Sequence, residues 1–465
     1  MMFCLQRKEE KRLYCLTAAI LTCTFLAIAL NPANMGILSI REWRNRKATE
    51  KPVAESRTEE KFYIYSWNEE LKDKLAYVTE QYPETADRIE FVDLYDSATY
   101  QDTIDELLEN PEAEKYPDMI ALEPNYIRKY TDSDYLIPVE ECGVTKEDMS
   151  EMYPYTLQVG TDSRNDSVKG VSWMVCPGAF AYRTDLADSL LDVESPEEMQ
   201  DEIGSWADFL ATANKINRKS GGKTKMLASN GEIANAFYAN KVKPWVTSDD
   251  VFQIDPAMEE YMDVYKALET KDLTQKAEQW SLEWMEGFSD DEVFGYFGCT
   301  WFLEWVIKLG CDGERVGEGT YGLWNICQGP APYYWGGTWI AATEGCSDKD
   351  LAGVIMKTLC CETETMLEMR EDTLDFVNNK AVMQALSDSG KGDDDFLGGQ
   401  DSIEIFSDVA KQIDVSCMTE YDEEINELFD QQVMIYTYEN KKKKDVISGF
   451  ESMVADRFPS LKVEH

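Results

Sequence analysis

The chain has 465 residues, of which 43% are hydrophobic and 12% aromatic, so it can build a large core but is too long for one ordinary domain. Its 89 acidic residues outnumber its 45 lysines and arginines, which gives a formal net charge of −44. A surface this acidic repels phosphate groups, so the composition argues against nucleic acid as a partner.

The only histidine is His465, the last residue. This position excludes Ser-His-Asp and Cys-His catalysis and nearly every histidine-bearing zinc site. The glycine pattern at 317–322 is followed by a run typical of a strand, whereas a dinucleotide-binding loop precedes a helix. No cysteine spacing is typical of a metal site, and we expect neither a cofactor nor a metal.

The N-terminal part is typical of an exported protein. Four basic residues between 7 and 12 precede an uncharged run of 18 residues from Leu13 to Leu30. This run suits either a retained membrane anchor or a cleaved secretion signal, while Thr22 before Cys23 fits a lipidation site poorly. Polar residues from 31 to 60 predict a linker. We therefore expect the protein at the extracellular face of the membrane, anchored or secreted.

A repeating pattern of strands and helices follows the linker. Apolar and β-branched runs predict strands at 61–66, 88–94 and 118–122, and helical periodicity predicts helices at about 67–81 and 100–108. Strand–helix–strand–helix–strand within about sixty residues is typical of a parallel sheet covered by helices.

The rest of the chain alternates in the same way. A long extended run at 169–182 breaks at Pro177-Gly178 and predicts a strand that crosses between two lobes. Further strands are expected at 294–299 and 323–327. Helical periods predict helices at 206–217, 233–240, 257–269, 301–309, 348–360, 406–413, 422–436 and 446–457.

One stretch, 332–343, concentrates aromatic residues around Gly336-Gly337. Glycines let the backbone bend or approach a ligand closely, and aromatic faces suit a flat amphipathic ligand such as a sugar ring. A buried strand with aromatic core residues explains the stretch equally well when it is considered alone.

Seven stretches in order resemble the bacterial extracellular solute-binding proteins of carbohydrate ABC transporters, the family of maltose- and oligosaccharide-binding receptors. The likeness covers roughly residues 61–465 and is carried by 63–68, 116–123, 181–186, 294–301, 334–342, 347–350 and 396–401. The resemblance implies an α/β, two-lobe periplasmic-binding-protein-like fold with a ligand cleft between lobes joined by crossing segments. The implied division is a targeting and linker part at 1–60, a first lobe from 61–174 and 292–336, and a second lobe from 175–291 and 337–465.

The resemblance also implies a set of ligand-binding positions at the ends of strands and beside the crossings. They are Trp67, Asn68, Glu69, Glu123, Asn125, Trp173, Trp301, Trp335, Trp339, Gln400 and Asp401. Simpler roles are open for several of them: Asn68 could cap a helix, Glu123 and Asn125 could form a turn around Pro124, and Trp173 could belong to the core.

The implied function is a non-enzymatic, monomeric receptor that captures a sugar or oligosaccharide and delivers it to the permease of an ABC importer. Polyamine receptors share the fold and a similar first strand, so a small cation is the alternative ligand. A glycoside hydrolase is the enzymatic alternative, since 89 acidic residues offer many pairs of carboxylates.

Overall fold

The structure is a computed structural model that describes residues 61–95, 97–439 and 441–463. The predicted leader and linker at 1–60 and the terminal histidine lie outside the described residues. Within the described ranges, no helix combines the length and the apolar character that crossing a membrane requires.

The first lobe is built on a five-stranded sheet in the order β2-β1-β3-β8-β4. Strand β1 runs parallel to β2 and β3, whereas β8 is antiparallel to both β3 and β4. The parallel part confirms the predicted strand–helix repeat. Its strands are β1 (Phe62–Ser66), β2 (Ile89–Asp93), β3 (Met119–Leu122), β4 (Gly170–Ser172) and β8 (Trp339–Ala342).

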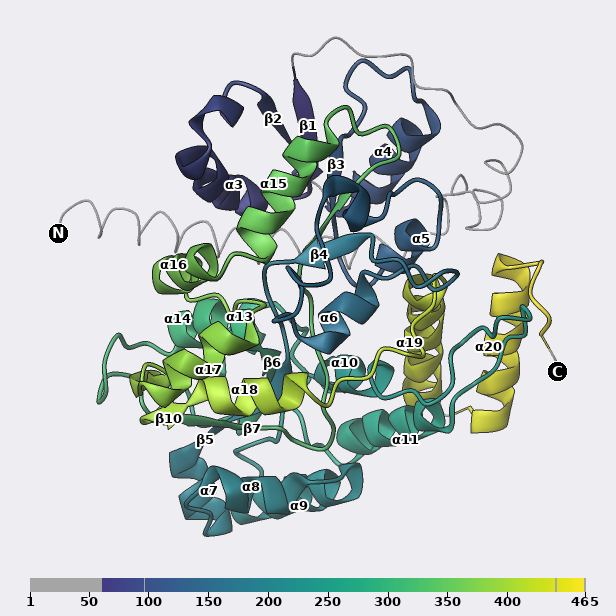
Figure 1. The fold of residues 1–465 in the computed structure, drawn as a ribbon. Helices are drawn as coiled ribbons and strands as arrows, with labels where there is room; N and C mark the ends of the chain where they lie inside the picture. Colours follow the sequence, from purple (N-terminus) through teal and green to yellow (C-terminus); the bar gives the residue numbers. More distant parts are fainter. Residues whose placement is uncertain (1–60, 96, 440, 464–465) are drawn as a thin grey trace.

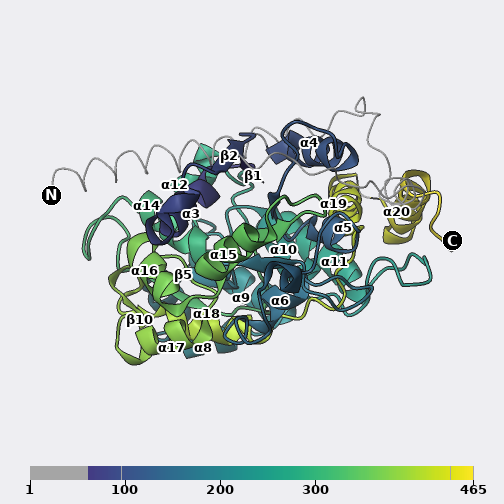
Figure 2. The same cartoon turned by 45° about the horizontal axis from the view of Figure 1, so that its top comes forward.

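Helices cover both faces of this sheet. Figures 1 and 2 show α3 and α15 side by side, and these two helices are in contact. The spacing of Leu71, Leu75 and Val78 places all three on the buried face of α3, as expected from the sequence. The helices of this lobe are α3 (Glu70–Gln81), η1 (Pro83–Thr85), α4 (Ser97–Glu109), α5 (Ile127–Thr131), η2 (Val139–Cys142), α6 (Pro154–Val159), α15 (Lys349–Cys360) and, after it, α16 (Thr363–Thr373).

The second lobe has a three-stranded antiparallel sheet in the order β6-β5-β7, with β5 (Gly178–Arg183) between β6 (Gly295–Cys299) and β7 (Trp324–Cys327). Every residue of β5 and β6 is buried. The helices that precede β7 in sequence are α7 (Thr184–Leu191), α8 (Pro196–Ile203), α9 (Trp206–Lys219), η3 (Asn230–Ile233), α10 (Ala234–Tyr238), α11 (Pro256–Thr270), α12 (Leu282–Glu286), α13 (Thr300–Phe302), η4 (Leu303–Ile307) and α14 (Lys308–Gly310).

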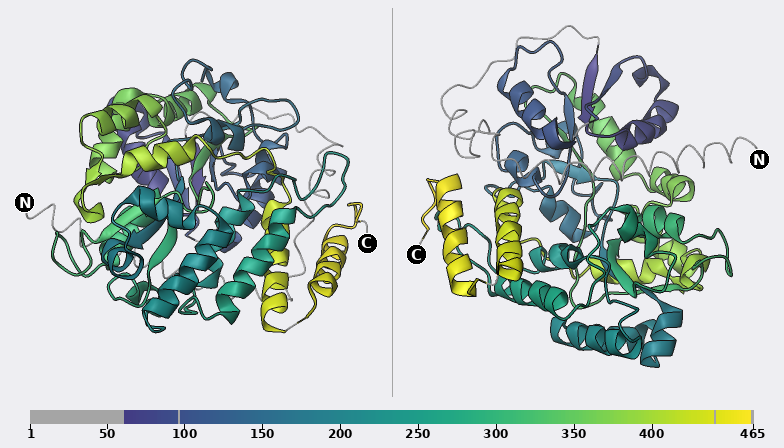
Figure 3. Two further views of the ribbon diagram at one scale, coloured as in Figure 1. Left: turned by 90° about the horizontal axis from the view of Figure 1, so that it is seen from below. Right: turned by 180° about the vertical axis from the view of Figure 1, so that it is seen from behind.

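The C-terminal part returns to the second lobe. Helix α18 contacts β5 and β7, and α19 packs against α11 and α20 at one side of the molecule (Figure 3). The elements are α17 (Lys380–Asp388), β9 (Asp393–Asp394), η5 (Asp395–Leu397), β10 (Gln400–Asp401), α18 (Ser402–Ala410), α19 (Asp422–Tyr438) and α20 (Lys443–Arg457).

Three crossing segments, at 173–177, 334–338 and 374–378, join the lobes side by side. Isolated β-bridges pair Met174 with Val377 and Pro177 with Tyr334. The amide of Trp335 donates to the carbonyl of Cys176 at 3.0 Å, which ties the second crossing to the first. The second crossing contains Gly336 at φ 74° and Gly337 at φ 117°, a backbone conformation that strongly favours glycine.

The strand pairing corrects the expected division of the chain. Residues 292–336 were expected in the first lobe, but β6 and β7 lie in this segment and pair with β5 of the second lobe. Residues from 337 were expected in the second lobe, but β8 inserts between β3 and β4 of the first. The chain therefore returns to the first lobe at β8 and α15, then crosses back through a third segment that the sequence did not reveal.

Candidate functional site

The register of the two sheets shows which strand ends face the other lobe. Leu122, the last residue of β3, pairs with Trp339, which follows directly on the second crossing segment. Strand β1 runs parallel to β3 and ends on the same side. In the second lobe, Cys299 at the end of β6 pairs with Gly178, which follows the first crossing. The loops after β1, β3 and β6 therefore meet where the lobes join, and we call this region the interlobe edge.

The loop after β1 contributes Trp67, Asn68 and Glu69 to this edge. The half-buried ring of Trp67 packs edge-on against Tyr100 with ring centroids 5.5 Å apart. Asn68 accepts a hydrogen bond from the amide of Glu70 at 3.0 Å, so its side chain already satisfies the start of α3. Glu69 accepts from Lys72 at 2.8 Å and Tyr95 at 3.0 Å. Trp67 thus keeps the ring surface best suited to a ligand.

The loop after β3 contributes Glu123 and Asn125. Asn125 is exposed, whereas Glu123 is largely buried and its carboxylate makes no hydrogen bond or ion pair with any residue that the structure describes. Burial raises the pKa of Glu123 to about 7. A carboxylate held in this way can accept hydrogen bonds from a ligand, because no protein donor occupies it.

A tryptophan cluster formed by Trp280, Trp301 and Trp335 occupies the second-lobe side of the edge. All three are half-buried. The rings of Trp280 and Trp301 are nearly parallel, at 13° and 6.2 Å, and Trp335 lies 5.1 Å from Trp301 and 5.6 Å from Trp280. Trp301 donates from its ring nitrogen to the carbonyl of Trp335 at 3.1 Å. This contact fixes the ring of Trp301 against the second crossing segment.

Trp280 was not among the sequence predictions. It lies in the loop before α12 and has φ 72°, a left-handed conformation that a bulky residue rarely adopts. No periodic pattern marks such a residue, because its position depends on one backbone angle rather than on a helix or strand. The only available signal was the density of tryptophans, with Trp284 four residues away.

Two of the predicted tryptophans are core residues instead of ligand contacts. Trp173 is fully buried and Trp339 is 1% exposed. The ring nitrogen of Trp339 donates to the carbonyl of Thr156 at 2.8 Å, which satisfies its polar atom inside the first lobe. Both side chains belong to the core beside the crossing segments, so the candidate site omits them.

Gln400 and Asp401 also have structural roles. The amide of Gln400 both accepts from and donates to the backbone of Ile326 in β7, at 2.8 Å in each direction. Asp401 caps α18 by accepting from the amides of Ile403 and Glu404. These contacts account for both side chains, so the candidate site omits them.

Acidic residues of α19 were a further group that the sequence did not single out. Glu423, at the start of α19, accepts from the amide nitrogen of Gln101 in α4 of the first lobe. Burial raises the pKa of Glu423 to about 7, and the negative charges of Glu427 and Glu123 contribute to the increase. The N-terminus of α19 therefore reaches the first lobe close to Glu123.

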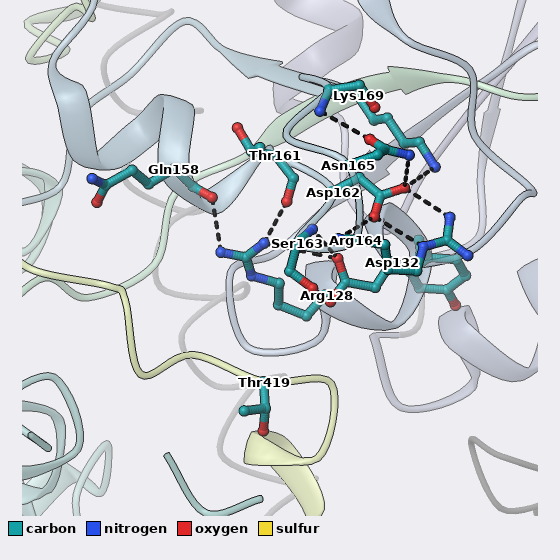
Figure 4. A network of polar contacts seen from close by, with 12 residues as sticks. Arg128, Asp132, Gln158, Thr161, Asp162, Ser163, Arg164, Asn165, Lys169 and Thr419 are labelled. Carbon is teal, nitrogen blue, oxygen red and sulfur yellow. Dashed lines mark hydrogen bonds and ion pairs between the residues drawn. The ribbon is translucent and has the colours of Figure 1, made fainter. Parts of the chain in front are cut away.

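A polar network around Arg128 and Asp162 holds α5, the helix that follows the loop after β3 (Figure 4). Arg128 in α5 donates to the carbonyls of Gln158 and Thr161. Asp162 is fully buried and accepts from Arg164 and Lys169, each at 2.7 Å. These contacts fasten α5, which begins four residues after Glu123, to the segment that leads into β4.

The space beside the tryptophan cluster is small in this arrangement. The cavity between the crossings and α13 measures about 10 Å³ and is lined by Trp301, Trp305, Asp375 and neighbours in 174–176. That volume holds about one water molecule, so this cavity by itself has no room for a sugar ring. Among the described residues, no group of histidine, cysteine, aspartate or glutamate could hold a metal ion.

Comparison with known families identifies the chain. A family model for bacterial extracellular solute-binding proteins matches residues 79–431. The chain belongs to this family. A comparison of the sequence with curated proteins finds no match.

Solved structures confirm the two-lobe fold of this solute-binding protein. A crystal structure described as extracellular solute-binding protein family 1 superposes with a TM-score of 0.73 at 15% identity, covering 85% of this chain and 99% of that one. The sugar-binding protein MalE from Xanthomonas citri superposes with a TM-score of 0.68 at 15% identity, covering 86% of this chain and 97% of that one. The ABC transporter-associated binding protein from B. animalis subsp. lactis Bl-04, in complex with beta-1,6-galactobiose, superposes with a TM-score of 0.63 at 16% identity, covering 86% of this chain and 97% of that one.

Proposed function

We propose that this solute-binding protein captures a sugar or oligosaccharide between its lobes and delivers it to the permease of an ABC importer. The observation that carries the proposal is the tryptophan cluster at the interlobe edge of a fold whose structural neighbours include sugar-bound receptors. Across the edge, Trp67 adds a fourth half-buried ring and Glu123 adds a free acceptor.

The chemistry of these residues suits a carbohydrate. The C–H faces of a sugar ring pack on aromatic faces, and its hydroxyls donate to fixed carboxylates. Micromolar capture requires about −8 kcal/mol, which a few stacked rings and charge-assisted hydrogen bonds can supply. Ligand contacts made by both lobes favour the closed arrangement, which the permease then recognises.

The proposal extends to the setting of the protein. We infer a non-catalytic monomer at the extracellular face of the membrane, held by the segment from Leu13 to Leu30 or secreted after its cleavage. The bacterial extracellular family supports the location, and the absence of internal histidines supports a binding role. The partners are then a small carbohydrate and the permease subunits of the importer.

Thermal-shift screening of the purified protein against sugars and polyamines tests the proposal. We expect a sugar to raise the melting temperature, with calorimetry confirming a stoichiometry of one. Stabilisation by a polyamine and by no sugar would replace the carbohydrate with a small cation. Release of reducing sugar from an oligosaccharide would instead indicate the glycoside hydrolase, and would show catalysis that a receptor lacks.

A further inference from the structure

One hydrogen bond joins the two lobes at a distance from the crossing segments. The side-chain nitrogen of Gln101 lies 3.1 Å from Oε1 and 3.0 Å from Oε2 of Glu423. Gln101 belongs to α4, which follows β2 of the first lobe, whereas Glu423 belongs to α19, which packs on α11 of the second. The two residues are 322 positions apart, and both are partly buried. The contact can persist only while the lobes are together.

The surroundings of this contact are acidic. Glu423 faces Glu427 from its own helix and Glu123 from the loop after β3. Lys129 of α5 is the cation that faces it, but the amine of Lys129 also donates to Asp105 at 2.5 Å. The charge of Glu423 is therefore incompletely balanced.

The acids that flank Glu423 in sequence have partners of their own. Asp422 pairs with Lys241 at 2.7 Å, and Glu424 pairs with Arg457. Neither cation is thus available to Glu423. Tyr126, on the loop after β3, lies near both Glu123 and Glu423, and the pKa of its hydroxyl is raised by burial and by these two carboxylates. It remains neutral and adds no positive charge.

We propose that the Gln101–Glu423 hydrogen bond is a latch that holds the lobes together before a ligand arrives, and that repulsion between Glu423 and Glu123 weakens this latch when both are ionised. The interlobe geometry supplies the latch, and the convergence of carboxylates from opposite lobes supplies its sensitivity to protons. This goes beyond ligand capture, because it predicts lobe closure in the absence of any sugar.

The direction of the pH effect follows from burial. In the arrangement described, burial raises the pKa of Glu423 and of Glu123 to about 7. On this proposal, opening the lobes exposes both carboxyls to solvent and returns their pKa values toward 4.5. The closed form thus binds more protons, and the closed population falls as pH rises between these values. For one such group, the ratio of closed to open molecules falls by roughly tenfold between pH 6 and pH 8.

Small-angle X-ray scattering of the purified, ligand-free protein tests the latch. We expect a smaller radius of gyration at pH 6 than at pH 8. Glu423→Gln removes the charge and keeps an amide that can bond to Gln101, so this variant should expand less than the unmodified protein between pH 6 and pH 8. Gln101→Ala should be expanded at both. Glu123→Gln, which leaves the latch itself intact, should reduce the response to pH.

Glu404→Gln is the matched control, because Glu404 is exposed on α18. It should respond to pH as the unmodified protein does. An unmodified protein with the same radius at both pH values would overturn the proposal, as would a Glu423→Gln variant that expands as much as the unmodified protein between pH 6 and pH 8. Neither outcome depends on sugar binding, so failure of the latch and failure of the proposed function are separable.

Discussion

Substitution of Asp162 by asparagine removes the charge at the centre of the network in Figure 4. Asp162 is fully buried and accepts from Lys169 at 2.7 Å, and Lys169 itself is only 4% exposed. An asparagine of the same shape leaves the Lys169 ammonium in the interior without its counter-charge. Breaking a buried pair from one side costs about 3–5 kcal/mol. The pair between Arg164 and Asp162 contributes less to stability, since the Arg164 side chain is 36% exposed and solvent screens the pair.

The pH dependence gives a second measure of the same interaction. Burial opposes the ionisation of Asp162, but hydrogen bonds from Arg164 and Lys169 outweigh it and lower its pKa. A carboxyl with a lowered pKa stabilises the fold above its unfolded value of about 4 and loses that contribution as the pH falls further. The difference in unfolding free energy between the unmodified protein and Asp162→Asn should therefore reach its full size at pH 7 and become smaller in acid.

Urea unfolding followed by far-ultraviolet circular dichroism measures the effect at pH 7. Asp192→Asn is the matched control, because Asp192 pairs with Lys219 at 3.5 Å with a side chain 90% exposed. Asparagine also tolerates the left-handed backbone of Asp192, so this control should change the unfolding free energy by no more than about 0.5 kcal/mol. A loss below about 1 kcal/mol for Asp162→Asn would refute the argument that Lys169 depends on this carboxylate.

Three further changes probe other parts of the molecule. Trp301→Ala should weaken binding of the best sugar at least tenfold, about 1.4 kcal/mol, by calorimetry, with Trp301→Phe recovering part of the affinity; a folded alanine variant with unchanged affinity would remove Trp301 from the site. Gly178→Ala should lower the unfolding free energy by about 3 kcal/mol in thermal unfolding, because the new Cβ meets the buried ring of Tyr333 at 2.1 Å. Gly170→Ala is the control and should be tolerated, because its new Cβ makes only ordinary contacts from 3.6 Å. Burial raises the pKa of Glu232 to about 8, so the contribution of Glu232 to stability is present below pH 4.5 and is lost as the pH rises to about 8. Glu232→Gln should flatten this decline of the unfolding free energy with pH, measured by urea titrations. An unchanged decline in the variant would contradict the prediction.

Local patterns in the sequence predicted most of the secondary structure. The helix expected at 67–81 is α3, which begins at Glu70, and the strand expected at 118–122 is β3. The periodicity of α3 reflects the burial of one face, and the apolar run of β3 reflects burial throughout. The assignment of later segments to lobes failed for a different reason. Strand β8 pairs with β3 and β4, and nothing within 337–465 indicates which distant strands it will join.

The site was predicted less completely than the fold. Trp301 follows β6 and Trp339 begins β8, and both lie beside a crossing segment. Only the packed structure shows that Trp301 is half-buried and that Trp339 is almost fully buried. The position of the Trp280 ring depends on the left-handed backbone conformation of that residue. Glu423 faces Glu123 of the first lobe, although the two residues are three hundred positions apart in the sequence. Sequence patterns report local burial, whereas these positions depend on long-range packing.

The position of β8 in the first sheet determines the order in which the two sheets can be completed during synthesis. Strand β7 at Trp324–Cys327 completes the second-lobe sheet, whereas the first-lobe sheet has a gap between β3 and β4 until β8 at Trp339–Ala342 emerges. The sheet of the lobe that is translated first is thus completed last, and pairing β8 with β3 and β4 closes long loops. A nascent chain that stops before β8 leaves β3 with an unpaired edge, a surface that invites pairing with other chains until the missing strand arrives.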